Sequence, residues 1–383
     1  MKNPIYLDYA ATTPVDNLVA DEMLRYIKTN SLFGNPSSNH VFGFKTDAAV
    51  EKARNIISEF LGCKANELIF TSGATESNNL AIKGVARANK DKGNHLITAL
   101  TEHKAVLDAC RSLEQEGFNI TYLEPDVYGR ISPEVLESAI TPETILVSIM
   151  HVNNETGVIQ DIVALGNLLA ERNIFFHVDA VQSVGKLPIS LSELPIDGLS
   201  FSSHKIYGPK GIGGLFLRRR SKVNIEPIIT GGGQEYGIRP GTLPTHQIMG
   251  LAKAIEIASQ KMSKDFEHVS SLSQHILKEC QKVPDIEING SLEYRLPNII
   301  NLSFIGVDSV SLITSLQHEV AISSGSACTS GAIEPSHVIK AMGIKGVRLD
   351  SAVRISIGRY STLEDIDNGL SRIIEEVDRI RKC

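Results

Sequence analysis

Lys205 is the side chain in this sequence whose surroundings best suit covalent chemistry. It follows an apolar run over residues 196–201 and opens a polar, glycine-rich stretch that leads into a second apolar run over 215–217. Two apolar runs around such a stretch predict two strands joined by a loop. A lysine whose pKa is lowered by its surroundings can form a Schiff base with a carbonyl compound. An arbitrary lysine at this position would be a solvated surface residue, so the interpretation depends on its neighbours.

Asp179 provides the second group, because it ends an apolar run over residues 174–178 that predicts a strand. In α/β sheets the carboxyl ends of strands face the crevice in which ligands bind. Pyridoxal 5′-phosphate (PLP) takes a lysine on its aldehyde and often an acid beside its pyridine nitrogen, which keeps the ring protonated and electron-accepting. The pair Lys205 and Asp179 therefore favours PLP, although an Asp after a strand is commonly only a cap or turn residue.

The elements that must position these groups alternate along the chain. Predicted strands over 67–71, 95–98, 120–123, 145–149 and 174–178 are interleaved with predicted helices from 74, over 103–116 and over 161–172. This alternation indicates an α/β fold with a mostly parallel sheet flanked by helices. Polar candidate groups follow the strands at Ser72 to Thr75, Glu102-His103, Asn153 to Glu155, Asp179 to Gln182 and Ser202 to Lys205. We therefore expect them to converge at one edge of the sheet.

Three of these stretches suit parts of a PLP site, and each also has a purely structural interpretation. The joint at Gly73 leads into a helix from Ala74 and Thr75, and helix N-termini bind phosphate through free N–H groups. His103 could stack on a planar ring or could simply cap its helix. Asn154 could donate to a ring oxygen or could be a turn residue.

The C-terminal part of the chain contributes two further candidates. After a long predicted helix over 247–281, Cys328 lies among Ser and Gly residues, in a context that suits a reactive thiol better than a core cysteine. Arg354 falls within a predicted strand and could clamp a substrate carboxylate, or form an inter-domain salt bridge. We expect a large domain over 15–260 and a smaller α+β domain made of 1–14 with 261–383.

Bulk properties narrow the class of protein. The chain has 383 residues, 42% of them hydrophobic, and a net charge of −6, so it has no global basic footprint for nucleic acid. It has neither an apolar run long enough to span a membrane nor the apolar core of a signal peptide near Met1. Five scattered cysteines form no disulfide framework. These features predict a cytoplasmic protein that contacts neither membranes nor nucleic acid directly.

Taken together, the motifs resemble one family. In order they read LDYAATTP, FTSGATESNNLAIKG, TEHKAVLDAC, IMHVNNETG, HVDAVQS, SSHKIYGPKGIG, RPGT and SSGSACTS, from Tyr6 to about Arg359. The chain is similar to group I cysteine desulfurases of the NifS/IscS type, most closely the IscS branch. These are class V aminotransferases with the fold-type I architecture of PLP-dependent transferases. It departs from the IscS pattern at Ser203 and Pro240, and in lacking the longer C-terminal tail that helps to dock the iron–sulfur scaffold.

The resemblance implies a role for each matching residue. Lys205 would bind PLP, Asp179 its ring nitrogen and Gln182 its ring hydroxyl oxygen, while His103 would stack on the ring. The phosphate would be held by Ala74, Thr75, Ser202, His204 and Thr242. Thr242 would reach across the two-fold axis of a homodimer. Asn154 and Arg354 would hold the substrate carboxylate and the ring region, and Asn154 would also contact the cofactor. Cys328 would be the nucleophile.

The implied reaction converts L-cysteine to L-alanine and leaves a persulfide on Cys328, with Lys205 and His103 moving protons. Sulfur would pass to an iron–sulfur scaffold or to a thiolation protein for tRNA or another sulfur pathway. No resident metal is expected, apart from transient ligation of an iron–sulfur cluster by Cys328. Two alternatives stay open: a selenocysteine lyase or aminotransferase on the same fold, and an inactive scaffold. A transaminase has no need of Cys328, and intact Lys205, Asp179 and His103 argue against a scaffold.

Overall fold

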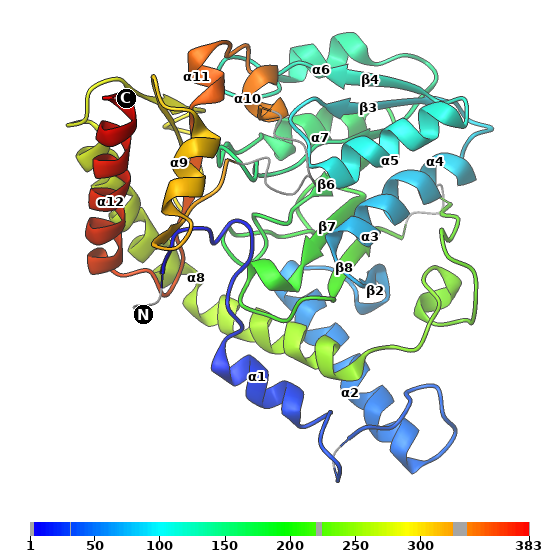
Figure 1. Cartoon of the computed structure of the whole chain (residues 1–383). Coiled ribbons are helices and arrows are strands. Elements are labelled where there is room, and N and C mark those ends of the chain that lie inside the picture. The colour runs from blue at the N-terminus through cyan, green and yellow to red at the C-terminus, as the bar shows by residue number, and fades with distance from the viewer. Residues whose placement is uncertain (1–3, 31, 220–223, 325–334, 383) are drawn as a thin grey trace.

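A seven-stranded sheet forms the centre of the described chain (Figure 1). The computed structural model describes residues 4–30, 32–219, 224–324 and 335–382. The strand order is β2-β8-β7-β6-β5-β3-β4. The bounds are β2 Leu68–Thr71, β3 His95–Ala99, β4 Asn119–Leu123, β5 Thr144–Ser148, β6 Phe175–Asp179, β7 Gly198–Ser202 and β8 Gly213–Leu217. All neighbours pair in parallel except β8, which is antiparallel to both β7 and β2. The mostly parallel sheet predicted from the sequence is confirmed.

Helices cover both faces of this sheet because its strands are apolar on both sides. One layer includes α2 (Val41–Leu61), α6 (Pro133–Ala139), α7 (Ile162–Ala170) and the first half of α8 (Thr245–Cys280). The other includes α4 (Val85–Ala88) and α5 (Lys104–Gln115), and α3 (Ala74–Asn79) contacts α5. Successive strand residues point to opposite layers, as in the pairs Leu96 and Ile97, Leu146 and Val147, and Phe175 and Phe176.

A second core forms beside the large sheet, at the end of α8 (Figure 1). It surrounds an antiparallel sheet of β12 (Ala352–Ser356), β10 (Ile299–Phe304) and β9 (Ile286–Asn289), with α9 (Ser309–Leu316) and α12 (Leu363–Arg381) against it. The short strands β1 (Ile5–Tyr6) and β11 (Val320–Ala321) pair in parallel, and α10 (His337–Ala341) and α11 (Val347–Asp350) complete this part. The predicted boundary at 260/261 falls inside α8, and the division into two domains stays a prediction.

Local capping explains where helices differ from the sequence-based expectation. The sequence pattern near the N-terminus predicts a helix over 15–28, whereas α1 covers only Asn17–Leu24. The Asp16 side chain accepts a hydrogen bond from the backbone of Leu18 and so starts the helix there. Helix α6 was not predicted, although Ser132 at its N-cap and Pro133 at its first position are typical start signals. Among the described residues, no helix is both long and apolar enough to cross a membrane.

His177 is a polar side chain in the middle of the sheet. On β6 it is fully buried, and its two ring nitrogens contact the hydroxyls of Ser148 on β5 (2.8 Å) and Ser200 on β7 (2.9 Å). Burial lowers the pKa of His177 to about 3, because a charged imidazolium would lose its hydration there. The folded protein therefore keeps this ring neutral at pH values at which an unfolded histidine is protonated.

We predict that this histidine makes the fold sensitive to acid. Between the pKa of an unfolded histidine, near 6.5, and its folded value the unfolded chain binds more protons, so stability falls as the pH falls. The loss is at most about 1.4 kcal/mol per pH unit from this group. Urea unfolding of the parent and of His177→Asn, measured at pH 7 and pH 5, should show a smaller loss in the variant. Equal losses in both proteins would contradict the assignment to His177.

Candidate active site

A cavity of about 460 Å³ lies at the carboxyl edge of the large sheet. Ten of the residues singled out from the sequence line it, namely Ala74, Thr75, His103, Asn154, Asp179, Gln182, Ser202, His204, Lys205 and Arg354. Thr242 is exposed and does not line this cavity. Cys328 lies outside the described residues. The predicted convergence of strand-end groups is therefore present in the structure.

The strand directions explain this convergence. Asp179 is the last residue of β6, and Ser202 ends the neighbouring parallel strand β7, which leads directly into a 3-10 turn over Ser203–Lys205. Strand β2 runs in the same direction as β7, because β8 is antiparallel to both. The joint after Thr71 therefore opens at the same edge as Lys205.

The N-terminal segment closes one side of the cavity beside Lys205. The Lys205 amine donates to the carbonyl oxygens of Ala10 (2.5 Å) and Ala11 (2.7 Å). The backbone N–H of Ala10 in turn donates to the hydroxyl of Ser356 on β12. Sequence reasoning did not predict these contacts, because backbone carbonyl groups are common to every residue and leave no signal in the sequence.

Asp179 and His103 face the same cavity from neighbouring parts of the edge. The two carboxylate oxygens of Asp179 accept from Asn78 Nδ2 (2.7 Å) and from the backbone of Val181 (3.0 Å). Burial lowers the pKa of His103, opposed by the charge of Asp179, so its imidazole is neutral near pH 7. His103 Nδ1 accepts from the backbone of Ala105 (3.1 Å), which assigns the ring proton to Nε2.

The joint between β2 and α3 leaves an open space next to Ser202. Gly73 has φ +149°, a value that residues with a side chain rarely adopt, and a Cβ placed on it would meet Ser202 Oγ at 3.9 Å. The backbone groups of Ala74 and Thr75 begin the helix on one side of this space. Burial lowers the pKa of His204 to about 4, with Lys205 adding to the effect, so its ring is neutral near pH 7. The donors here suit a compact anion such as phosphate.

Arg354 joins the second core to the cavity. Its guanidinium donates to the carbonyl oxygen of Asn154 (2.9 Å) and to the carboxylate of Asp8 (2.7 Å). It is 4% exposed, and its Nε has no hydrogen-bond partner among the described residues. A guanidinium that lines a cavity can bind a carboxylate that enters.

Two further side chains that line the cavity, Glu155 and His337, and the neighbouring Glu102 were missed as candidates or were noted only for their position. Glu102 is fully buried, which raises its pKa well above the ordinary value, and Met150 donates to it. Glu155 is also fully buried, with a raised pKa, and accepts from Ser336. His337 lines the cavity and its Nε2 contacts the backbone oxygen of Glu102 (2.9 Å). No sequence signal marks His337, since a Ser-His pair at a helix start is common.

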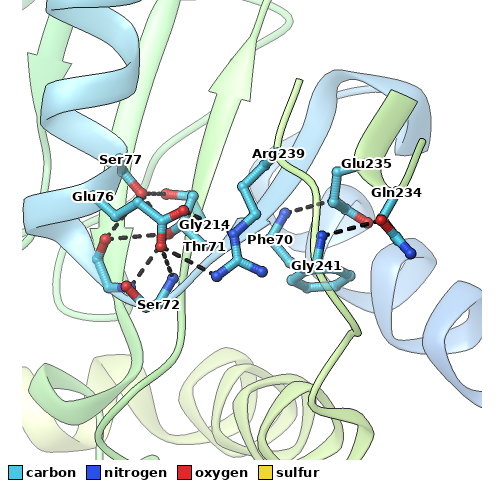
Figure 2. Close-up of polar contacts among 11 residues, drawn as sticks. Phe70, Thr71, Ser72, Glu76, Ser77, Gly214, Gln234, Glu235, Arg239 and Gly241 are labelled. Carbon is cyan, nitrogen blue, oxygen red and sulfur yellow. Dashed lines mark hydrogen bonds and ion pairs between the residues drawn. The ribbon is translucent and has the colours of Figure 1, made fainter. Parts of the chain in front are cut away.

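The segment that carries Thr242 is fixed to the start of α3 and to β2 (Figure 2). Glu76 accepts from the backbone of Ser72 (2.6 Å) and from Arg239 (2.7 Å), so one carboxylate links the joint after β2 to this segment. Glu235 accepts from the backbone of Phe70 (2.6 Å) and forms a two-pronged ion pair with Arg54. The segment that precedes Thr242 is thus held on its own chain, because Glu235 contacts Phe70 on β2 and Arg239 contacts Glu76 at the start of α3.

We predict that the Arg54–Glu235 ion pair is essential to stability. The two side chains are 3% and 1% exposed, so Glu235→Gln would leave a guanidinium charge buried without its partner, at a cost of about 3–5 kcal/mol. Glu51 also contacts Arg54, but it is 50% exposed, so Glu51→Gln is a matched control expected to cost at most about 1 kcal/mol. Urea unfolding of both variants measures the difference, and equal costs would contradict it.

The chemistry of the donor set fits PLP. An amine, a buried carboxylate and a neutral imidazole face one cavity, and the space between Gly73 and Ser202 can take a phosphate. The three groups come from the ends of three different strands, with His103 after β3, Asp179 at the end of β6 and Lys205 after β7. The fold of the sheet is therefore what brings them together.

Comparison with known proteins agrees with this donor set. The family described as aminotransferase class-V matches residues 5–368. A cysteine desulfurase IscS from Aeromonas salmonicida is 51% identical over 383 residues, which cover 100% of this chain and 95% of the relative. A solved NifS-like protein superposes with a TM-score of 0.92 at 36% identity, covering 98% of this chain and 100% of its own. The structure described as SspA in complex with cysteine has a TM-score of 0.83 at 41% identity, covering 93% and 99%.

These matches extend over nearly the whole chain and include both the large sheet and the second core. The chain belongs to the class-V aminotransferase family, in its cysteine desulfurase branch, whose members use PLP.

Proposed function

We propose that this chain converts L-cysteine to L-alanine and takes the released sulfur onto Cys328 as a persulfide. The observation that supports it most is the meeting of Lys205, Asp179 and Arg354 at one cavity. The relative in complex with cysteine supports the choice of substrate. The IscS relatives are named for the same reaction class.

The proposed cofactor contacts divide between the ring and the phosphate. Lys205 would bind the aldehyde, Asp179 the ring nitrogen and Gln182 the ring hydroxyl oxygen, with His103 stacked on the ring. The phosphate would be held by Ala74, Thr75, Ser202 and His204. When bound, PLP supplies an electron-accepting ring that makes the α-proton of the substrate acidic.

The protein's own groups would orient the substrate and move its protons. Arg354 and Asn154 would hold the substrate carboxylate, since both line the cavity and the Arg354 guanidinium is positively charged. Lys205 would accept the α-proton. His103 already has its proton on Nε2, which makes it a proton donor in this state.

The proposed reaction balances without an added oxidant. The carbon–sulfur bond of L-cysteine breaks and a sulfur–sulfur bond forms to Cys328. The thiol protons end on the β-carbon of alanine and on the persulfide. L-cysteine and the Cys328 thiol thus give L-alanine and Cys328 persulfide, and an acceptor thiol or scaffold would then remove the outer sulfur.

The proposal includes a homodimer and a sulfur acceptor. Thr242 is exposed and fixed on its own chain through Glu76, Arg239 and Glu235, which suits a residue that completes the phosphate site of a second subunit. The acceptor would be an iron–sulfur scaffold or a thiolation protein, and the setting would be the cytoplasm, as expected from the sequence.

The first test is the reaction itself. Purified protein with PLP, L-cysteine and a reductant should release sulfide and alanine in equal amounts, as measured by sulfide and amino-acid assays. Cys328→Ser should keep the visible spectrum of bound PLP and lose sulfide release by at least about 100-fold, because the sulfur has no thiol to receive it. Bound PLP without sulfide release in the parent would contradict the proposal and favour selenocysteine or amino-group transfer.

We predict that His103 contributes a proton as well as a stacked ring. His103→Phe keeps a planar ring and removes the Nε2 proton, so PLP content should be retained while alanine formation slows by about 10²-fold or more. His103→Gln keeps an N–H donor without the stacked ring and serves as the comparison. An unchanged rate in His103→Phe would restrict His103 to stacking.

A further inference from the structure

Lys186 is a half-buried lysine next to the candidate active site that the proposed reaction leaves without a role. It lies one helical turn after Gln182, in a turn closed by hydrogen bonds from Val184 to Ala180 and from Leu187 to Ser183. Its amine donates to Gln182 Oε1 (2.9 Å). Lys186 also lines a small second cavity of about 40 Å³, on whose wall Lys205 lies as well.

A short network of hydrogen bonds connects the two lysines. Gln182 Nε2 donates to the carbonyl oxygen of Ala10 (3.0 Å), and the Lys205 amine donates to the same oxygen (2.5 Å). The chain of contacts therefore runs from Lys186 through Gln182 and Ala10 to Lys205. Both Gln182 and Lys205 also line the large cavity.

This network permits only one orientation of the Gln182 amide. A carbonyl oxygen can only accept, so the amide nitrogen must face Ala10, and the amide oxygen then faces the donating amine of Lys186. The Lys186 amine donates to the amide oxygen and so stabilises the same orientation that the Ala10 carbonyl requires. Lys186 and Ala10 together determine which end of Gln182 lies on the side of Lys205.

The two amines also oppose each other electrostatically. Burial, and after it the charge of Lys205, lowers the pKa of Lys186 to about 7. The repulsion acts equally on both partners, so a charge on Lys186 disfavours a second charge on Lys205. The other titratable groups on the small cavity are Tyr9, Tyr207, Asp265 and Arg359, and Asp265 accepts from Arg359 (2.8 Å). The charge of Lys186 also contributes to the lowered pKa of His204.

We propose that Lys186 is a positioning residue of this enzyme that orients the Gln182 amide and, from behind Lys205, opposes positive charge on the Lys205 nitrogen. The inference rests on the proposed function, because it concerns the nitrogen that would carry PLP. A lysine nitrogen that is neutral at physiological pH is a better proton acceptor for the substrate.

The test is a pH titration of the visible spectrum of the PLP-loaded protein without substrate, which reports protonation of the lysine nitrogen bound to the cofactor. Lys186→Met removes the charge and the donor, and Lys186→Gln removes the charge alone. In both, the pH of half-protonation should rise by about one unit, because the repulsion is gone. Lys186→Arg keeps a positive donor at every pH of the titration, so its pH of half-protonation should not rise above that of the parent.

Lys253→Met is the control for net charge, since Lys253 pairs with Glu256 on α8 away from both cavities. It should leave the titration unchanged. Unchanged titrations in Lys186→Met and Lys186→Gln would overturn the inference, even with a lower melting temperature, since that result indicates packing alone. If neither variant binds PLP, Lys186→Arg decides, and loss of PLP there would also overturn it. A parent protein without bound PLP or sulfide release would instead contradict the proposed function.

Discussion

The direction of the strands is the constraint on which the rest of this structure depends. Because β5, β6 and β7 are parallel neighbours, their carboxyl ends lie at one edge of the sheet. Asp179 and Lys205 meet there, together with His103 from the end of β3. The reversed strand β8 allows β2 to point the same way, which adds the joint at Gly73. One architectural rule therefore assembles groups that are far apart in the chain.

The N-terminal segment and Arg354 join this edge to the second core. Ala10 and Ala11 provide the carbonyl oxygens that take the Lys205 amine, and Ser356 and Arg354 on β12 hold the same segment through Ala10 and Asp8. The cavity is therefore built by both cores. A change in how they pack would move the lysine contacts and the arginine together.

Burial sets the protonation states at the site. It lowers the pKa of His103 and His204, so both rings act as neutral hydrogen-bonding groups near pH 7. It raises the pKa of Glu102 and Glu155, which favours their neutral acid forms.

From the sequence alone, the alternation of apolar runs was enough to predict the mostly parallel sheet, and residues such as Lys205 and Asp179 could be placed at its edge. Each of those signals is local, since it needs only a residue type and its distance from a strand end. The partners of those residues could not be predicted in this way. The carbonyl oxygens of Ala10 and Ala11 at Lys205, the contact of Gln182 with Ala10, and His337 at the cavity depend on how distant segments pack. Backbone carbonyls have no distinctive sequence pattern. Only the tertiary structure decided these contacts, because they arise from packing between segments up to hundreds of residues apart.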